Sequence, residues 1–366
     1  MTDKTQAPHD ESPVQRPTGM GSIIVWTLAI AVAFGALVAV LQVDNWGNNG
    51  NGLSPRFGID TAKLTEVDPA LIAYVETQSI PLQMDVVHAI ATDRDNRLLV
   101  AGDSVVQVLS AEGELVKSIP LASEPTCIAV AAEDHPYEGR IFVGTGNRIE
   151  LFDDNGDSVG SLTDGLDEKT ALTSIAVFEN SVFAADAGNR VVLHWDAEGK
   201  QIGVIGTPAP DRGIIGFVVP SAHFDIVASD DGLLRVANPG ARRVETYTAN
   251  GDLLGHWGTA SASIEGFFGC CNPAAIAMLA DGRFVTAEKG IPRVKVYDAE
   301  GVLDSVVATP QMFSKGMTNT IEIRDDHSLQ VLDVATDRED RILILDPNRR
   351  EIRIFERTTA SDANHE

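Results

Sequence analysis

Short apolar runs separated by polar turns recur along most of the chain. Five four-residue turns end in glycine and follow a β-branched or aromatic run: 110–113, 153–156, 196–199, 248–251 and 298–301. Glycine supplies the positive φ that a tight hairpin requires, so each turn predicts a β-hairpin. Two further apolar runs precede each hairpin, as in CIAV followed by RIFVG. The repeated unit is therefore four short antiparallel strands.

The first strand of each unit shows the period of the repeat. The central apolar residues of these strands are Ile90, Ile128, Ile175, Ile226, Ile276 and Val334, with gaps of 38, 47, 51, 50 and 58 residues. Four-stranded units at this spacing are typical of propellers. The fold class predicted is all-β, a six-bladed β-propeller of four-stranded antiparallel blades.

The sixth unit lacks a fourth strand, because the residues after 351–355 are polar up to the C-terminus. A strand-like segment, LIAYVETQSI at 71–80, lies just before the first unit. We predict that it completes the sixth blade by pairing with 351–355, which closes the ring and removes an open sheet edge. The predicted propeller spans 71–356, and a disordered tail follows at 357–366.

One uncharged apolar segment precedes the repeat. Residues 23–41 contain only Thr27 as a polar residue, and 19 residues at 1.5 Å each approach the ~30 Å of a bilayer core. We predict a disordered cytoplasmic tail at 1–21, an uncleaved transmembrane signal-anchor helix at 22–42 and a flexible linker at 43–70. Lys4 and Arg16 precede the segment and no basic residue follows it until Arg56, which favours an extracytoplasmic propeller, periplasmic if the source is bacterial.

Charge narrows the range of partners. Lys and Arg number 28 against 53 Asp and Glu, a net charge of −25, which excludes nucleic acid as the expected partner. We expect contact with the membrane through the N-terminal helix and, as partner, another membrane or periplasmic protein. Three cysteines are too few for a disulfide scaffold.

Two stretches resemble a known repeat family. FAADAGNRVVLHWDAEGKQIGVIG (183–206) is similar to the NHL repeat, and GHWGTASASIEGFFGCCNPAAIAM (255–278) is similar to the linker between NHL blades. The resemblance covers 71–356 and implies a six-bladed propeller, in a family whose members bind protein, RNA or ligands, with a few enzymes. The residues it assigns to the structural motif are Asp186, Asn189, Arg190, Gly113, Gly156, Gly199, Gly251, Gly301, Phe268 and Pro273. Blade four departs from the pattern, with Asn238 at the position of the aspartate.

In five of the six predicted blades a polar residue falls between the second and third strands: Asp103, Asp186, Asn238, Glu288 and Asp346. Such carboxylates suit Ca²⁺, but one per blade is also what a structural turn cap predicts. Glu288 and Lys289 replace the usual aspartate, so they join the candidate binding residues.

The adjacent cysteines Cys270 and Cys271 interrupt a blade-to-blade linker. They suit a vicinal disulfide, a soft-metal site or a free pair, and functional and structural roles stay open. Cys127 begins the inner strand of blade two, where a small buried apolar residue is the alternative. Alignment of the inner strands places His88, His223, Asp225 and Asp333 near the channel mouth. Cysteine with histidine suits copper or zinc, so the expected cofactor is unknown, either none or one of these ions.

These features favour a membrane-tethered, extracytoplasmic scaffold that binds a protein or ligand. Long linkers at 206–223, 258–273 and 308–328 place the site at the channel mouth. One alternative is an accessory subunit of a membrane redox or metal-handling assembly that uses the cysteine pair. Another is a metal-dependent propeller lyase or hydrolase, although no G-x-S-x-G motif occurs and no catalytic residue is assigned.

Overall fold

A computed structural model describes residues 24–27, 29–35, 64–133, 135–229, 231–314 and 331–358. The chain divides into two units, Met1–Asp60 and Thr61–Glu366. In the first unit, residues 24–27 and 29–35 of the predicted 22–42 segment are helical and exposed. Among the described residues, no helix combines the length and hydropathy needed to cross a membrane. The rest of that segment, the 1–21 tail, most of the 43–70 linker and 359–366 lie outside the described residues.

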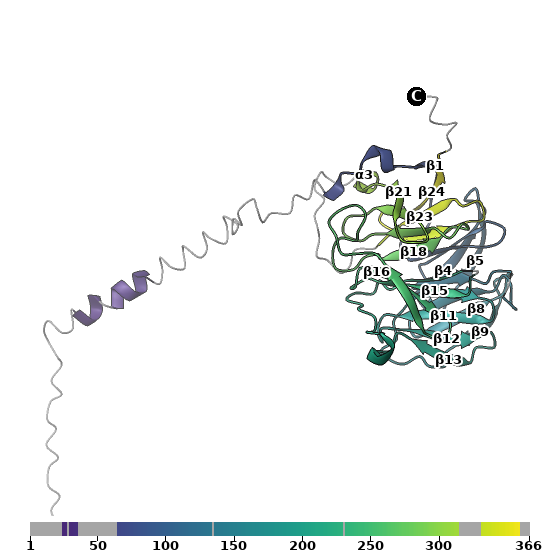
Figure 1. Ribbon diagram of the computed structural model, residues 1–366, viewed down its shortest axis with the longest axis horizontal. Helices are drawn as coiled ribbons and strands as arrows, with labels where there is room; N and C mark the ends of the chain where they lie inside the picture. The colour runs from purple at the N-terminus through teal and green to yellow at the C-terminus, as the bar shows by residue number, and fades with distance from the viewer. Residues whose placement is uncertain are drawn as a thin grey trace, which may run out of the picture. The chain divides into compact units, whose positions relative to one another are not determined.

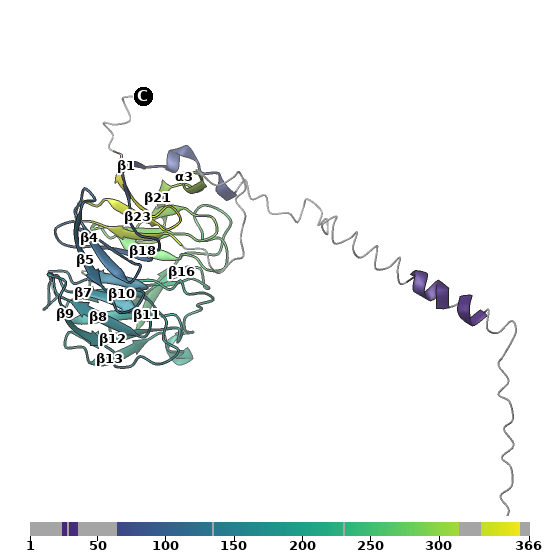
Figure 2. The ribbon, with the colours of Figure 1, turned by 180° about the vertical axis from the view of Figure 1, so that it is seen from behind.

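The second unit contains six antiparallel four-stranded sheets arranged as blades (Figures 1 and 2). Blade one is β2 (Ala89–Thr92), β3 (Leu98–Gly102), β4 (Val105–Leu109) and β5 (Leu115–Pro120), and blade two is β6 (Cys127–Val130), β7 (Ile141–Thr145), β8 (Arg148–Phe152) and β9 (Ser158–Leu162). Blade three is β10 (Leu172–Phe178), β11 (Ser181–Asp186), β12 (Val191–Asp196) and β13 (Gln201–Ile205), and blade four is β14 (Ile226–Ala228), β15 (Leu233–Asn238), β16 (Arg243–Thr248) and β17 (Leu253–Trp257). Blade five is β18 (Ala275–Met278), β19 (Phe284–Ala287), β20 (Val294–Tyr297) and β21 (Leu303–Ala308), and blade six is β22 (Asp333–Thr336), β23 (Ile342–Asp346), β24 (Glu351–Arg357) and β1 (Tyr74–Pro81).

The inner strand of each blade is the first of its repeat unit, and β1 is the outer strand of blade six. Successive inner strands contact each other around the ring, and β22 contacts β2. The predicted all-β, six-bladed propeller is confirmed. The described part of this unit also contains short helical elements outside the blades: η1 (Pro69–Leu71), η2 (Pro210–Arg212) and α3 (Pro310–Ser314).

The ring closes as predicted, through β1 and β24. Their antiparallel register places Glu76 opposite Phe355 and Ile80 opposite Ile352. The figures show β1, from early in the chain, beside the yellow C-terminal strands (Figures 1 and 2). Ile80 is 4% exposed and packs in a core cluster shared by blades six and one. Closure therefore buries apolar surface as well as pairing an edge.

The hairpin glycines show that β1 is a true outer strand. In each case the glycine of one blade lies over an apolar side chain near the end of the preceding blade's outer strand, buried in four cases and partly buried for Trp257: Gly113 over Ile80, Gly156 over Ile119, Gly199 over Leu162, Gly251 over Ile205 and Gly301 over Trp257. A Cβ on Gly113 would lie 2.6 Å from Cγ2 of Ile80, and its φ is +92°. The turn thus needs glycine for its backbone conformation and for the close approach of its neighbour.

The polar residues after the second strands hold the incoming linkers. Asp186 is fully buried, and its Oδ1 accepts the backbone N–H groups of Ala171, Gly188 and Asn189, while Oδ2 accepts from Nδ2 of Asn189. In blade one, Asp103 accepts the N–H groups of two linker residues, and in blade four Asn238 accepts that of Val218. These contacts support the structural interpretation of the motif. Arg190, by contrast, is exposed.

One residue of the predicted linker motif packs differently from the prediction. Phe268, which the resemblance assigns to the structural motif of the linker, is only half-buried. Its neighbour Phe267 is fully buried and lies against the rings of Trp257 and Tyr297. Adjacent residues in an extended linker point in opposite directions, so a one-residue offset exchanges the packed and exposed rings. Pro273 is buried, just before β18.

Candidate functional site at the channel mouth

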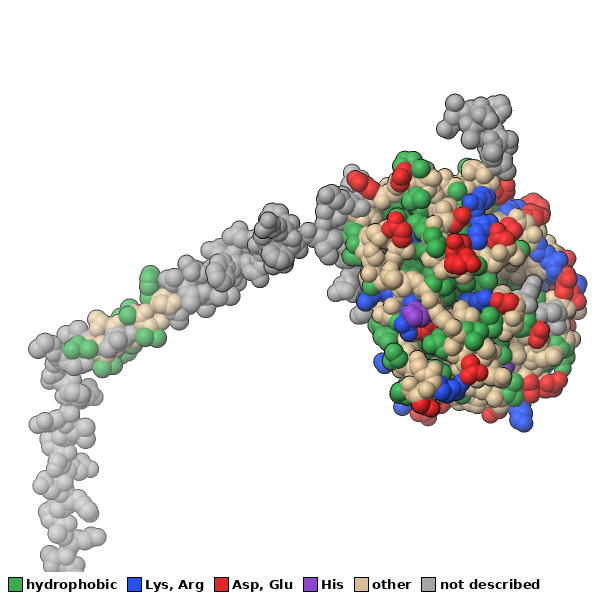
Figure 3. All heavy atoms as spheres, viewed as in Figure 1, with side chains coloured by type: hydrophobic (Ala, Val, Ile, Leu, Met, Phe, Trp, Pro, Cys, Tyr) green, Lys and Arg blue, Asp and Glu red, His purple; other side chains and the backbone are tan. Residues whose placement is uncertain are grey.

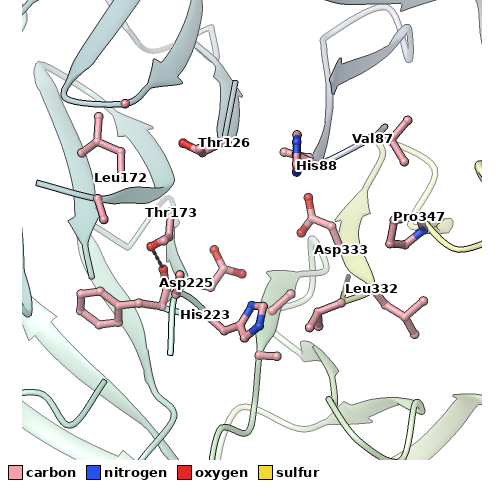
Figure 4. A pocket seen from close by; sticks show the side chains of 18 of the residues that line it. Val87, His88, Thr126, Leu172, Thr173, His223, Asp225, Leu332, Asp333 and Pro347 are labelled. Carbon is pink, nitrogen blue, oxygen red and sulfur yellow. Dashed lines mark hydrogen bonds between the residues drawn. The ribbon is translucent and has the colours of Figure 1, made fainter. Parts of the chain in front are cut away.

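A cavity of about 450 Å³ lies at the ends of the inner strands where the linkers arrive. All six blades contribute to its wall (Figure 4). Linker and inner-strand residues such as Thr126 and Thr173 line it, together with Gly146 and Pro347 from loops between second and third strands. The two kinds of loop therefore share one face, as the repeat predicts. Of the candidate residues, this cavity gathers His88, His223, Asp225 and Asp333.

The two aspartates occupy equivalent positions, each directly before the central apolar residue of its inner strand. Oδ1 of Asp225 accepts the N–H of Ile226 at 2.9 Å, and Oδ2 accepts that of Ile276, in blade five, at 2.6 Å. Oδ1 of Asp333 accepts the N–H of Val334, and Oδ2 accepts that of Ile90, in blade one, each at 2.9 Å. Each carboxylate thus ties its inner strand to the inner strand of the next blade.

Both carboxylates retain some surface toward the cavity, and Figure 4 shows them on either side of it, directed inward. Withdrawal from bulk water raises the pKa of Asp225 and of Asp333 above the usual carboxyl range. The charge of Asp225 raises the pKa of Asp333 further. The backbone N–H groups oppose both shifts because they stabilise the ionised forms. The wall therefore holds two acids that ionise reluctantly and influence each other.

The two histidines have different environments. Burial and, to a smaller extent, the ammonium group of Lys289 lower the pKa of His223 to about 4, so this ring is neutral at pH 7. Nε2 of His88 lies 2.8 Å from Oε1 of Glu124, an exposed carboxylate. His88 is thus engaged by a rim residue that the sequence did not single out. Within the described part of the chain, no three His, Cys, Asp or Glu side chains are placed to hold a metal ion together.

Cys127 is not one of the described residues that line this cavity. It is 2% exposed, and its Sγ packs so closely on Gly144 that a Cβ there would lie 2.4 Å away. Burial raises the pKa of its thiol to about 12. The structure thus places Cys127 in the buried core between blades two and three, outside the cavity wall.

The cysteine pair forms a second location, separate from the described cavity wall. Cys270 is exposed, Cys271 is 4% exposed, and their sulfur atoms lie 3.3 Å apart as free thiols. Asn272 follows the pair and anchors it, because its side chain bonds to both the N–H and the C=O of Lys289. Lys289 therefore lies beside the pair and also acts on His223.

Glu288 belongs to neither location. It is 1% exposed, and its carboxylate accepts from Nε and Nη2 of Arg293 at 2.7 and 3.0 Å and lies 2.7 Å from Nζ of Lys295. Nζ of Lys295 also donates to the carbonyl oxygens of Ile264 and Gly266 in the linker. The structure thus places Glu288 in a buried ion-pair network that holds the blade-five linker, outside the cavity wall.

Comparison with known proteins supports the propeller fold and gives no information about function. No known protein family's sequence pattern and no curated protein sequence matches the chain. A streptogramin B lyase structure has a TM-score of 0.54 and 11% identity, over 80% of this chain and all of that one. A catalytically inactive virginiamycin B lyase from Staphylococcus aureus with quinupristin has a TM-score of 0.51 and 13% identity, over 76% and 83%. The WD40 β-propeller domain of Doa1 has a TM-score of 0.52 and 10% identity, over 78% and 98%.

Proposed function

We propose that the protein is a membrane-tethered, extracytoplasmic propeller of the NHL type that binds a ligand or a segment of a partner protein at its channel mouth. The cavity carries this proposal, because all six blades build its wall and its volume of about 450 Å³ suits a small molecule or one large side chain. The tether rests on the uncharged 23–41 segment and on the basic residues that precede it.

The cavity wall indicates what kind of group it accepts. Asp225 and Asp333 hold their carboxylates in place with backbone hydrogen bonds, and their remaining lone pairs face inward. The neutral ring of His223 adds no positive charge. A group that donates hydrogen bonds and carries positive charge, such as an amine or a guanidinium, complements this wall. The net charge of −25 favours its approach, although Figure 3 shows acidic and basic side chains interspersed on one face of the propeller.

A lyase or hydrolase is the second candidate function, favoured by one observation at the same wall. Carboxyl groups with raised pKa values beside a neutral histidine are suited to proton transfer near neutral pH. The similarity to two lyase structures shows the shared fold and carries no argument about the reaction.

Photo-crosslinking in cells of the source tests the binding site. Ala222 is exposed and lines the cavity, while Ala299 is exposed in the β20–β21 hairpin, at the opposite ends of the strands. A photoreactive phenylalanine analogue at position 222 should capture the occupant, and the same analogue at position 299 should not. Equal capture at both positions, or capture only at 299, would contradict the site.

Protease added to intact spheroplasts tests the tether and its orientation. The propeller should be digested or released, because the proposed anchor places it outside the cytoplasm. Complete protection until the cells are lysed would show that the orientation is wrong. Extraction of the chain by alkaline carbonate without detergent would show that the apolar segment does not anchor it.

A further inference from the structure

Two thiol groups at the interface between blades four and five have no part in the proposed function. Cys270 and Cys271 are neighbours in the linker that enters blade five, with sulfur atoms 3.3 Å apart. One thiol is exposed and the other is 4% exposed. An accessible thiol with a second thiol within reach is the arrangement that reversible redox sites share.

The backbone on both sides of the pair is held in place. Nδ2 of Asn272 donates to the carbonyl oxygens of Phe268 and Lys289, and its Oδ1 accepts the N–H of Lys289. Nη1 of Arg242, from blade four, donates to the carbonyl oxygen of Gly269 at 3.3 Å. Asn272 is itself 1% exposed. These contacts keep the two thiols together without a covalent bond between them.

The two sulfur atoms differ in their surroundings, which separates their roles. Burial raises the pKa of the Cys271 thiol and the neighbouring Cys270 raises it further, whereas Ser221 and the ammonium group of Lys289 oppose this shift without reversing it. Cys271 is therefore shielded from large reagents, and its thiol ionises less readily than a free cysteine. Cys270 is the sulfur that an external reagent meets first.

We propose that Cys270 and Cys271 form a reversible dithiol–disulfide site that exchanges electrons with a disulfide-bearing partner, either a thiol–disulfide carrier protein or a small-molecule disulfide. The Cys270 thiol loses its proton and attacks one sulfur of the partner's disulfide, which breaks that bond and releases one partner thiol. The Cys271 thiol then loses its proton and attacks Sγ of Cys270, which forms the bond between the two cysteines and releases the second partner thiol. The protein is oxidised by two electrons, and the partner's disulfide is reduced to two thiols.

Covalent geometry makes this bond easy to reverse. Adjacent residues have Cα atoms about 3.8 Å apart across a trans peptide, which is below the usual range of about 4.4–6.8 Å for disulfides. A disulfide between neighbours is therefore strained, and strained disulfides are reduced more readily. It also closes a very short loop and adds little stability through chain entropy. These properties suit exchange better than they suit a structural crosslink.

This inference goes beyond the proposed function and does not rest on it. The test uses the full-length chain, equilibrated with reduced or oxidised glutathione, alkylated and analysed by mass spectrometry of its peptides. Oxidised glutathione should convert the peptide that contains both cysteines to an internal disulfide, and reduced glutathione should restore two alkylated thiols. Cys127 should keep its thiol in both conditions, because it is 2% exposed.

Three variants distinguish the two-step exchange from simple surface oxidation. Cys271→Ser should accumulate a glutathione adduct on Cys270, because no second thiol remains to displace it. Cys270→Ser should leave Cys271 largely unmodified, because that sulfur is shielded. Cys127→Ser should oxidise and recover like the wild type. The proposal is overturned if the wild type keeps a stable glutathione adduct on Cys270, or if both thiols stay reduced in oxidised glutathione.

Discussion

Truncation of Ile80, a buried side chain of β1, should destabilise the whole propeller. Ile80 is 4% exposed, fills the space over Gly113 and packs with Ile352 and Leu343. Ile80→Ala leaves a cavity where blades six and one meet, and such changes cost about 2–5 kcal/mol. With about 290 residues at roughly 2.1 cal/mol/K each, the unfolding entropy is about 0.6 kcal/mol/K, so Tm should fall by roughly 3–8 °C.

Thermal unfolding of the full-length chain, followed by circular dichroism, measures this loss. Val75 lies on the same strand but is 50% exposed, so Val75→Ala should change the free energy of unfolding by less than about 0.5 kcal/mol and serves as the matched control. Deletion of 71–80 should abolish the cooperative transition, because it leaves blade six unpaired. If Ile80→Ala melts like Val75→Ala, β1 is not part of the cooperative ring and the closure argument fails.

Two further predictions concern the buried charges. Glu288→Gln should lower the free energy of unfolding by about 3–5 kcal/mol, seen as a lower Tm, because it leaves the buried Arg293 and Lys295 without their counter-charge; an unchanged Tm would show that the network contributes nothing. Asp225→Ser should lower the pKa of Asp333, measured by carbon NMR, because burial alone then raises it. Both acids ionise at a higher pH in the folded chain than in the unfolded chain, so the free energy of unfolding should fall as the pH rises from about 4 to neutrality. This fall should be smaller in Asp225→Ser than in the wild type. An equal dependence on pH in the two proteins would contradict the coupling.

Strand order and ring closure could be predicted because they follow from counting. Each hairpin glycine marks one blade, and the missing strand after 351–355 has a single partner in sequence, 71–80. Alignment of the inner strands also placed Asp225 and Asp333 at the mouth, since equivalent positions of a repeat have equivalent places in the ring. The sequence therefore predicted the architecture and the part of the cavity wall that the repeat itself builds.

Side-chain direction and partner choice could not be predicted in the same way. Phe267 and Phe268 are adjacent, and only the folded linker shows which ring is buried. The sequence does not show that Glu288 is part of an ion-pair network, because its partners Arg293 and Lys295 become neighbours only through the β19–β20 hairpin. Cys127 aligns with Asp225 and Asp333, yet it packs in the core between blades two and three, where Gly144 leaves room for the sulfur. Each of these outcomes depends on local packing that no repeat pattern records.

A comparison within the molecule supports our proposal that the two aspartates act on an occupant of the cavity. Ser174 occupies the same position in blade three, and its Oγ accepts the N–H of Ile226 in blade four at 3.2 Å. A neutral hydroxyl thus makes the same tie between inner strands that Asp225 and Asp333 make with carboxylates. The tie needs no charge, whereas each carboxylate is costly to ionise at this depth, as its raised pKa shows. Under the proposed function, a carboxylate that faces the cavity at a position where a hydroxyl would suffice is explained by the action of its charge or its proton on an occupant.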